Sequence, residues 1–196
     1  MLDTHARKYI TKPINKISKF MLSKKFTPLH ITILALAIGL IPAVLILTTN
    51  LIYLPVIVLW ISGLFDVVDG NMARISNQKT DFGGFCDIVF DRFVEISIIL
   101  SLAYVYPKSS FTLLLLTASI LISMTIFLTV GALVVNKKEK AFKYQTGLME
   151  RTEGFIFFTL MMIFRNHVSQ ISLVFVLFIG YTIIQRFREA LILLKD

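Results

Sequence analysis

The chain has 196 residues, of which 56% are hydrophobic and 16% charged, and its formal net charge is +8. Its mean hydropathy of +0.79 is too high for a soluble domain of this length, and the apolar residues occur in long runs. These values predict an all-α integral membrane protein. The basic charge could suggest nucleic acid, but no recognition motif accompanies it. We therefore expect no nucleic-acid partner and attribute the charge to membrane topology and contact with anionic lipids.

Residues 3–25 predict an amphipathic lead-in to the first membrane span. They lack the apolar core of a cleaved signal peptide, so none is expected. The apolar residues at helical spacing are Ile10, Ile14, Ile17 and Met21, whereas three lysines fall elsewhere on the helix. We expect a short interfacial helix in the headgroup plane, divided into two pieces by Pro13. A solvated tail is the alternative.

Six apolar segments predict six transmembrane helices within a single membrane-embedded domain, residues 1–196. The segments cover residues 31–49, 53–68, 85–106, 111–135, 154–164 and 171–184. Thr27 and Pro28 predict the helix start before the first segment, because threonine caps helices and proline fits their first position. A polar connector is expected over residues 75–84.

The fifth segment is shorter than a membrane span. It has 11 uncharged residues, and a crossing needs about 20. Its helix must therefore extend back through Glu153, Arg151 and Glu150, which places these charges at membrane depth, facing the cavity of the acidic residues considered below. The alternative is that Arg151 reaches outward to the lipid headgroups.

Lysine and arginine are distributed unequally between the two sides of these spans. Eighteen of the 20 fall on one side, and Lys108 and Arg165 fall on the other. The positive-inside rule makes the heavier side cytoplasmic. We expect a multi-pass protein of the cell membrane with both termini and the acidic residues at the cytoplasmic face.

Four aspartates occur within 26 residues at the inner ends of the second and third spans: Asp66, Asp69, Asp87 and Asp91. The first two are i, i+3 and the last two are i, i+4, so each pair shares one helix face. If the two helices pack antiparallel, the carboxylates converge as a site for one or two hard divalent cations requires. Mg²⁺ is the default and Mn²⁺ is compatible. A solvated acidic loop is the alternative.

The spacing D-x2-D-G-x2-A-R-x8-G-x3-D-x3-D resembles the signature of the CDP-alcohol phosphatidyltransferase family at all eight fixed positions. Members of that family transfer a phosphatidyl group from a CDP-linked lipid to an alcohol and release CMP. The resemblance implies a metal-dependent transferase of phospholipid biosynthesis, with two ions and a homodimeric assembly. Residues 27–32 also resemble the family's T-P-N-x-x-T opening, with Leu29 in place of the usual asparagine.

The resemblance also implies roles for individual residues. Asp66, Asp69 and Asp87 match the metal-binding aspartates. Asp91 matches the last aspartate, which completes the metal site and acts as general base on the acceptor hydroxyl. The positions that admit or contact the CDP group are matched by Gly70, Ala73, Arg74 and Gly83.

The residues around the motif bear on the acceptor alcohol. Asp91 followed by Arg92 resembles the branch of the family that uses inositol phosphate, although Glu95 stands where that branch tends to have aspartate. Lys143, Arg151 and Arg188 either form a pocket for an acceptor's phosphate or are topology charges only. We favour a phosphorylated polyol, inositol phosphate or glycerol phosphate, over an unphosphorylated acceptor such as serine. From another class, a cation transporter is the alternative.

Overall fold

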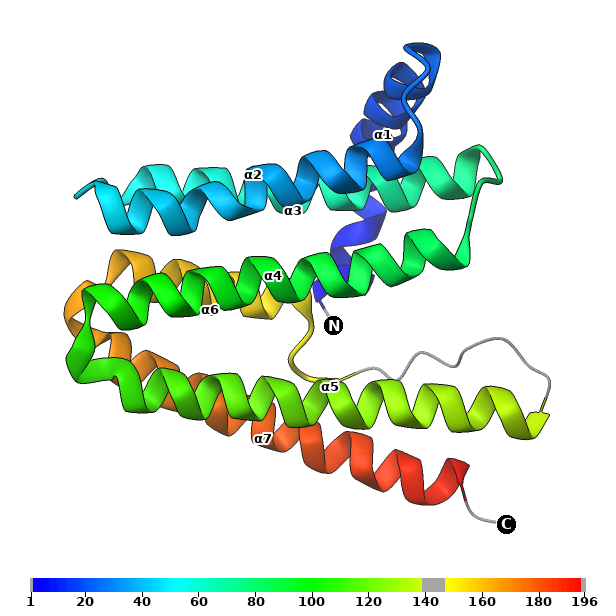
Figure 1. Cartoon of the computed structure of the whole chain (residues 1–196). Helices are drawn as coiled ribbons and strands as arrows, with labels where there is room; N and C mark the ends of the chain where they lie inside the picture. The colour runs from blue at the N-terminus through cyan, green and yellow to red at the C-terminus, as the bar shows by residue number, and fades with distance from the viewer. Residues whose placement is uncertain (1, 139–146, 195–196) are drawn as a thin grey trace. The chain divides into compact units, whose positions relative to one another are not determined.

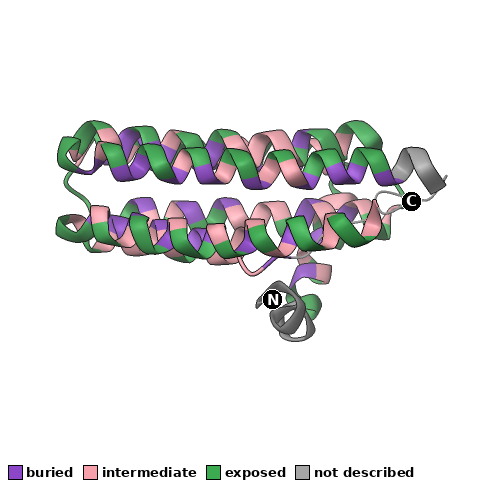
Figure 2. Ribbon diagram, turned by 90° about the horizontal axis from the view of Figure 1, so that it is seen from below, coloured by how far each residue is buried: buried purple, intermediate pink, exposed green. Residues whose placement is uncertain are grey.

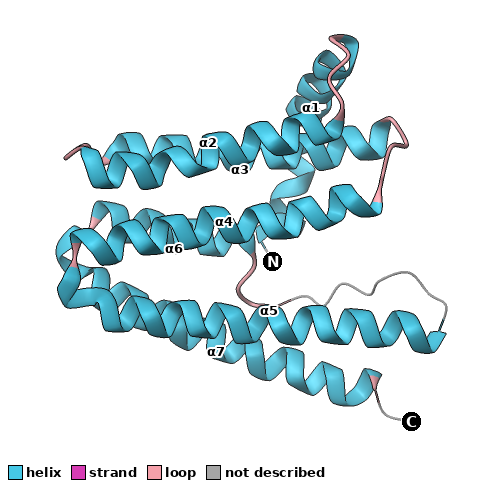
Figure 3. Ribbon diagram, in the orientation of Figure 1, coloured by secondary structure: helices cyan, strands magenta, loops and turns pink. Residues whose placement is uncertain are grey.

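A computed structural model describes residues 2–138 and 147–194 of the chain, without the side chains of residues 2–10 and 135–138. The described residues are almost entirely helical and contain no strand (Figure 3). They form two compact units, residues 2–107 with helices α1–α4 and residues 108–194 with helices α5–α7 (Figure 1). The prediction of an all-α protein is confirmed.

The first unit contains α1 (Leu2–Ser23), α2 (Pro28–Thr48), α3 (Tyr53–Ile75) and α4 (Asp81–Val105). Helix α2 packs against both α3 and α4, and α1 packs against α3. The short connections 49–52 and 76–80 make α3 antiparallel to α2 and to α4. In Figure 1, α1 runs across the other three helices of this unit.

The helices of the first unit approach one another closely at Gly39 on α2. A Cβ atom at this position would lie 2.5 Å from Cγ2 of Val94 on α4 and 2.7 Å from Oγ of Ser62 on α3. The Ser62 hydroxyl donates a hydrogen bond to the carbonyl oxygen of Ala35 at 2.8 Å. Glycine therefore permits a contact among three helices that any larger residue would disturb.

The second unit contains α5 (Ser110–Lys138), α6 (Arg151–Ile163) and α7 (Val168–Leu193), with short 3₁₀ turns at Pro107–Ser109 and Arg165–His167. Helix α7 packs against α5 and α6. The Ser172 hydroxyl donates to Oγ1 of Thr112 at 2.8 Å, and Arg186 Nη1 donates to the carbonyl and hydroxyl oxygens of Ser123, each at 2.9 Å. Buried polar groups on α7 are thus bonded to α5.

Four helical stretches are long and apolar enough to cross a membrane: Pro28–Thr48, Tyr53–Ile75, Pro107–Val134 and Arg165–Leu193. Large apolar side chains are exposed along the length of these helices, whose exposed residues are green in Figure 2. Examples are Leu40, Leu47, Ile57, Leu64, Leu121 and Leu177. Apolar residues around the whole helix are typical of membrane spans.

The other two expected spans, α4 and α6, are not among these four. Helix α4 is long but contains several charged residues. Helix α6 has 13 residues, which extend about 20 Å at 1.5 Å per residue, less than the roughly 30 Å hydrocarbon core. It includes Arg151 and Glu153 as expected, whereas Glu150 is the N-cap residue outside it.

The helix start predicted at Thr27 and Pro28 is confirmed. The His30 amide donates to Oγ1 of Thr27 at 3.3 Å, and the Thr27 amide donates to Nδ1 of His30 at 3.4 Å. Pro28 is the first residue of α2, where its missing N–H is not needed.

Two local predictions were wrong. Helix α1 is continuous through Pro13, because the residues that follow, Ile14 and Ser18, are buried where α1 packs on α3. The polar connector is also shorter than residues 75–84. Thr80 caps α4, its Oγ1 accepting a hydrogen bond from the Gly83 amide at 3.0 Å, so both glycines after Phe82 lie within the helix.

Candidate metal centre

The acidic residues of α3 lie on one face of the last turns of this helix. Asp66, Asp69, Gly70 and Ala73 are spaced i, i+3, i+4 and i+7, which places them along a single stripe. Two aspartates are therefore followed by two small residues along the stripe. The stripe points the carboxylates in one direction and leaves the backbone beside them accessible.

Three aspartates from two helices meet at this face. One carboxylate oxygen from each of Asp66, Asp69 and Asp87 lies within 4.8 Å of the other two. Asp69 is only 6% exposed, Asp66 is half-buried and Asp87 is exposed. The antiparallel turn from α3 to α4 thus brings together carboxylates that are far apart along the chain, as the sequence predicted.

The donor set fits a hard divalent cation. Oδ2 of Asp69 is buried and accepts no hydrogen bond from any described residue. A buried carboxylate oxygen without a donor is costly unless a cation lies beside it. Three carboxylate groups at this separation can supply the oxygen ligands that Mg²⁺ and Mn²⁺ prefer.

Asp91, the fourth predicted ligand, lies one turn after Asp87 on α4 and is half-buried. It is not a member of the close group of three among the described residues. Its charge is near enough to interact with those of Asp69 and Asp87. The structure therefore brings three of the four predicted ligands together and places the fourth beside them.

The next turn of α4 contains an ion pair. Nη1 of Arg92 lies 2.6 Å from Oε2 of Glu95, and Nη2 of Arg92 donates to Oε1 of Glu95 at 2.7 Å. Glu95 is 8% exposed. The guanidinium of Arg92, the residue after Asp91, is thus held by Glu95 one turn further along the same helix.

The predicted CDP-contacting residues border the aspartates. Gly70 and Ala73 are half-buried and Arg74 is exposed on the same helix. An added Cβ at Gly70 would lie 3.7 Å from Nη1 of Arg74. Gly83 lies in the first turn of α4, where an added Cβ would be 3.0 Å from Oγ1 of Thr80.

Two of the predicted acceptor-binding residues, Arg151 and Arg188, are in the second unit. Lys143 lies outside the described residues. Arg151 begins α6 and is half-buried, with its guanidinium 5.4 Å from the ring centre of Phe155. Arg188 is exposed near the end of α7.

Two residues near the aspartates had no role assigned from the sequence. Thr32 is buried on α2, and its side chain approaches the carboxylate of Asp69. Its signal was its place at the end of the T-P-L-H-I-T segment. Asn71 lies inside the motif at a variable position and bonds to α1. Sequence spacing alone gives no signal for that contact.

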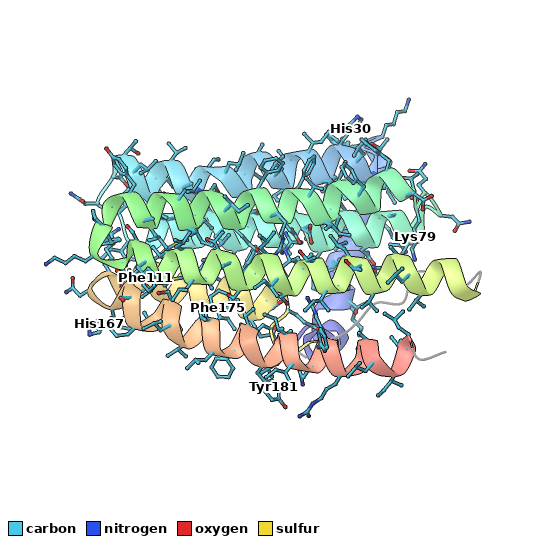
Figure 4. All side chains as sticks on the ribbon, turned by 60° about the horizontal axis from the view of Figure 1, so that its bottom comes forward. His30, Lys79, Phe111, His167, Phe175 and Tyr181 are labelled. Atoms are coloured by element: carbon cyan, nitrogen blue, oxygen red, sulfur yellow. The ribbon has the colours of Figure 1, made fainter. Side chains whose placement is uncertain are left out.

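His30 and Lys79 mark one end of the first unit (Figure 4). His30 is in the first turn of α2, and Lys79 is in the connection between α3 and α4. The aspartates lie close to this connection in sequence, on its two flanking helices. The acidic site therefore belongs to an end of the helical unit and not to its middle.

Comparison with known proteins gives a family and several relatives. A family model described as CDP-alcohol phosphatidyltransferase matches residues 25–184, which include parts of both units. A phosphatidylinositol phosphate synthase of Corynebacterium glutamicum is 24% identical over 156 residues, covering 80% of this chain and 71% of the relative. An archaetidylinositol phosphate synthase of Pyrococcus horikoshii is 32% identical over 97 residues, about half of each protein.

A solved structure has a similar fold. The crystal structure of Mycobacterium tuberculosis phosphatidylinositol phosphate synthase with CDP-DAG bound matches with a TM-score of 0.72 and 20% sequence identity. The match covers 91% of this chain and 93% of that chain. At this identity, the likeness establishes the fold only.

Proposed function

Because the chain belongs to the CDP-alcohol phosphatidyltransferase family, we propose that it transfers the phosphatidyl group of a CDP-linked lipid, of the CDP-diacylglycerol type, to an acceptor alcohol and releases CMP. The observation that carries this proposal is the group of Asp66, Asp69 and Asp87, whose oxygens lie within 4.8 Å of one another. A phosphate ester is the substrate class that such a cation site suits.

In this proposal Asp66, Asp69 and Asp87 hold a divalent cation, Mg²⁺ or Mn²⁺, and Asp91 completes the ligand set for a second ion. The buried Oδ2 atom of Asp69, which accepts no hydrogen bond from the described residues, supports its role as a ligand. When bound, the cations would neutralise phosphate charge and polarise the phosphorus centre.

The reaction needs a base and a place for the nucleotide. Asp91 takes the proton from the acceptor hydroxyl, whose oxygen forms a bond to the lipid-side phosphorus. The bond from that phosphorus to the oxygen bridging the two phosphates breaks, and CMP leaves with that oxygen. Gly70, Ala73 and Gly83 admit the CDP group close to the backbone, and Arg74 contacts its phosphates.

The acceptor is a phosphorylated polyol, either inositol phosphate or glycerol phosphate. Support comes from the two relatives described above, which are named as synthases of phosphatidylinositol phosphate and archaetidylinositol phosphate. Lys143, Arg151 and Arg188 bind the acceptor's phosphate, for which guanidinium groups have suitable geometry. Residues 1–196 act as one domain in this proposal.

The chain crosses the cell membrane six times, with both termini and the acidic site at the cytoplasmic face. Helix α1 lies in the headgroup plane. Its exposed Lys12, Lys16 and Lys19 support this placement, because they are opposite the residues that pack on α3 and can meet anionic lipids. A homodimer is proposed on the family resemblance alone.

A product assay tests the function and the acceptor together. The purified protein is reconstituted with CDP-diacylglycerol, Mg²⁺ and a mixture of inositol phosphate, glycerol phosphate, inositol and serine, and products are identified by mass spectrometry. We expect CMP and one lipid with a phosphorylated polyol headgroup. Release of no CMP would contradict the reaction, and a product from inositol or serine alone would contradict the acceptor.

A further inference from the structure

A polar contact joins α1 to the part of α3 that contains the aspartates. Nδ2 of Asn71 donates hydrogen bonds to Oδ1 of Asn15 at 2.8 Å and to Oγ of Ser18 at 2.9 Å. The Ser18 hydroxyl donates in turn to the carbonyl oxygen of Val68 at 3.4 Å. Both amide hydrogens of Asn71 are thereby used, and Ser18 bridges two α3 residues one turn apart.

This contact lies on the back of the acidic stripe. Residues i+2 on a helix point to roughly opposite sides, so Asn71 faces away from Asp69. Val68 and Met72 lie on the same back face and form a buried apolar cluster with Ile14 and Ile31. Helix α1 therefore supports the turn of α3 from behind, while the carboxylates face the other way.

Apolar packing alone would not fix how α1 lies on α3. Ser18 is completely buried, and a buried hydroxyl is costly unless its hydrogen bonds are made. Sliding or rotating α1 would break the bonds of Ser18 and Asn71. The polar contact therefore selects a single register for α1 on α3.

The carboxylates give a reason for such support. Three like charges within 4.8 Å repel one another before a cation neutralises them. Two of the three are on the α3 turn that α1 contacts. A turn held from behind keeps its ligands in place with less reorganisation when the cation binds.

We infer that Asn71 is a positioning residue for the cation site. Through its bonds to Asn15 and Ser18, it fixes α1 against the back of the α3 turn that contains the aspartates Asp66 and Asp69. This inference rests on the proposed function, because it assumes that the aspartates bind a cation. Asn71 itself touches neither the cation ligands' oxygens nor the substrate in this role.

The test measures Mn²⁺ binding to the purified full-length protein in detergent by electron paramagnetic resonance of the free ion. Asn71→Leu removes both donated bonds, and Asn15→Ala removes one acceptor and keeps the rest of α1. We expect each variant to raise the Kd for Mn²⁺ about three- to tenfold, below the 10–100-fold cost of losing a partner bonded directly to a ligand. The double variant should be no worse than Asn71→Leu, because both changes break one contact.

Ser23→Ala is the matched control, since Ser23 is exposed on α1 and its hydroxyl donates to the carbonyl oxygen of Phe20 in the same helix. Its Kd for Mn²⁺ should equal that of the unmodified protein.

A second readout separates positioning from general loss of structure. In Asn15→Ala, the metal concentration for half-maximal CMP release should rise, whereas KM for the CDP-lipid at saturating metal should not change.

The outcomes separate the inference from the function on which it rests. An unmodified protein that binds Mn²⁺, with both variants within twofold of its Kd, would overturn the role of Asn71 and leave the proposed function standing. An equal rise in Ser23→Ala would overturn it as well. An unmodified protein that binds no Mn²⁺ would overturn both. If Asn71→Leu does not fold, Asn15→Ala alone decides between these results.

Discussion

The three aspartates of the proposed cation site differ in their exposure to solvent. Asp69 is 6% exposed, with a buried oxygen that accepts no hydrogen bond from the described residues, whereas Asp87 is exposed on α4. In the proposed site Asp69 is therefore the inner ligand, and a cation or phosphate would approach from the side of Asp87. The two ligands should differ in function, because loss of the buried one leaves the cation bound on one side only.

The ion pair between Arg92 and Glu95 should contribute to stability more than a surface pair does. Its hydrogen bond is 2.7 Å long and its second nitrogen–oxygen contact is 2.6 Å, and the side chains of Arg92 and Glu95 are 28% and 10% exposed. We expect Arg92→Leu and Glu95→Leu each to lower the free energy of unfolding by about 1–3 kcal/mol, because each leaves a partly buried charge without its partner. Unfolding by SDS in mixed micelles, followed by circular dichroism, measures this change.

The double variant is the control for this pair. Because it removes both charges, it should be closer in stability to the unmodified protein than the two single changes added together. Single variants within about 0.5 kcal/mol of the unmodified protein would show that the pair behaves as an exposed one.

At the scale of residues, the sequence predicted which aspartates lie together but not which residues contact them or their helix from elsewhere in the chain. Asp66, Asp69 and Asp87 follow from helical periodicity and from the short antiparallel turn between two spans. Thr32 and Asn71 did not follow, because their contacts join residues distant in the chain, and local spacing does not encode such pairs. Lys143 lies outside the described residues, so its role stays a prediction.

Helix α2 organises the first unit although it contributes no carboxylate to the site. It packs against both α3 and α4, the helices that supply the aspartates. Gly39 lies at the point where a Cβ would meet Val94 and Ser62. The separation of α3 from α4, and hence of Asp69 from Asp87, depends on this packing.

Gly39→Ala should therefore destabilise the protein. The added methyl would overlap Cγ2 of Val94 at 2.5 Å and Oγ of Ser62 at 2.7 Å, and overpacking of this kind costs about 1–3 kcal/mol. The change is measured by SDS unfolding in mixed micelles. Gly180→Ala on α7 is the control, since an added Cβ there meets no atom within 4 Å, and it should be neutral or slightly stabilising. Equal stability of both variants would contradict the close approach at Gly39.

Helix positions could be predicted better than helix ends. The apolar runs gave α2 and α5 to within about three residues at each end, because a membrane span needs an uninterrupted apolar segment. They also gave the starts of α3 and α7, but these two helices continue well beyond the apolar runs, to Ile75 and Leu193. The effect of Pro13 was misjudged, since packing on α3 is not visible in the local sequence. The start of α4 was placed too late, because Gly83 and Gly84 suggested a loop although Thr80 caps the helix before them.

At the scale of the whole molecule, the charge distribution predicts how the chain crosses the membrane. Only Lys108 and Arg165 fall on the expected outer side. Helix length and composition identify four candidate spans, whereas α4 and α6 were predicted as spans from the apolar segments 85–106 and 154–164. The composition cannot decide these two, because acidic residues on α4 and the shortness of α6 both weaken the hydropathy signal.

Single cysteines test this topology. The one native cysteine, Cys86, is buried and is replaced by alanine as the background. With a membrane-impermeant maleimide on intact cells, we expect labelling of Asn50→Cys, Lys108→Cys and Asn166→Cys. Lys79→Cys should be labelled only after permeabilisation, because it lies in the inner connection. Protection of Lys108→Cys would contradict the crossing by α4, and protection of Asn166→Cys would contradict the crossing by α6.

The rate of CMP release from CDP-diacylglycerol tests the central claim, a cation-dependent transfer at the aspartates, most directly. With Mg²⁺ and inositol phosphate or glycerol phosphate, the unmodified protein and Asp81→Asn, an exposed control at the start of α4, should release CMP at similar rates. Chelation should abolish release, and Asp69→Asn should lower the rate about a thousandfold, equivalent to about 4 kcal/mol. CMP release that persists after chelation and in Asp69→Asn would contradict the account.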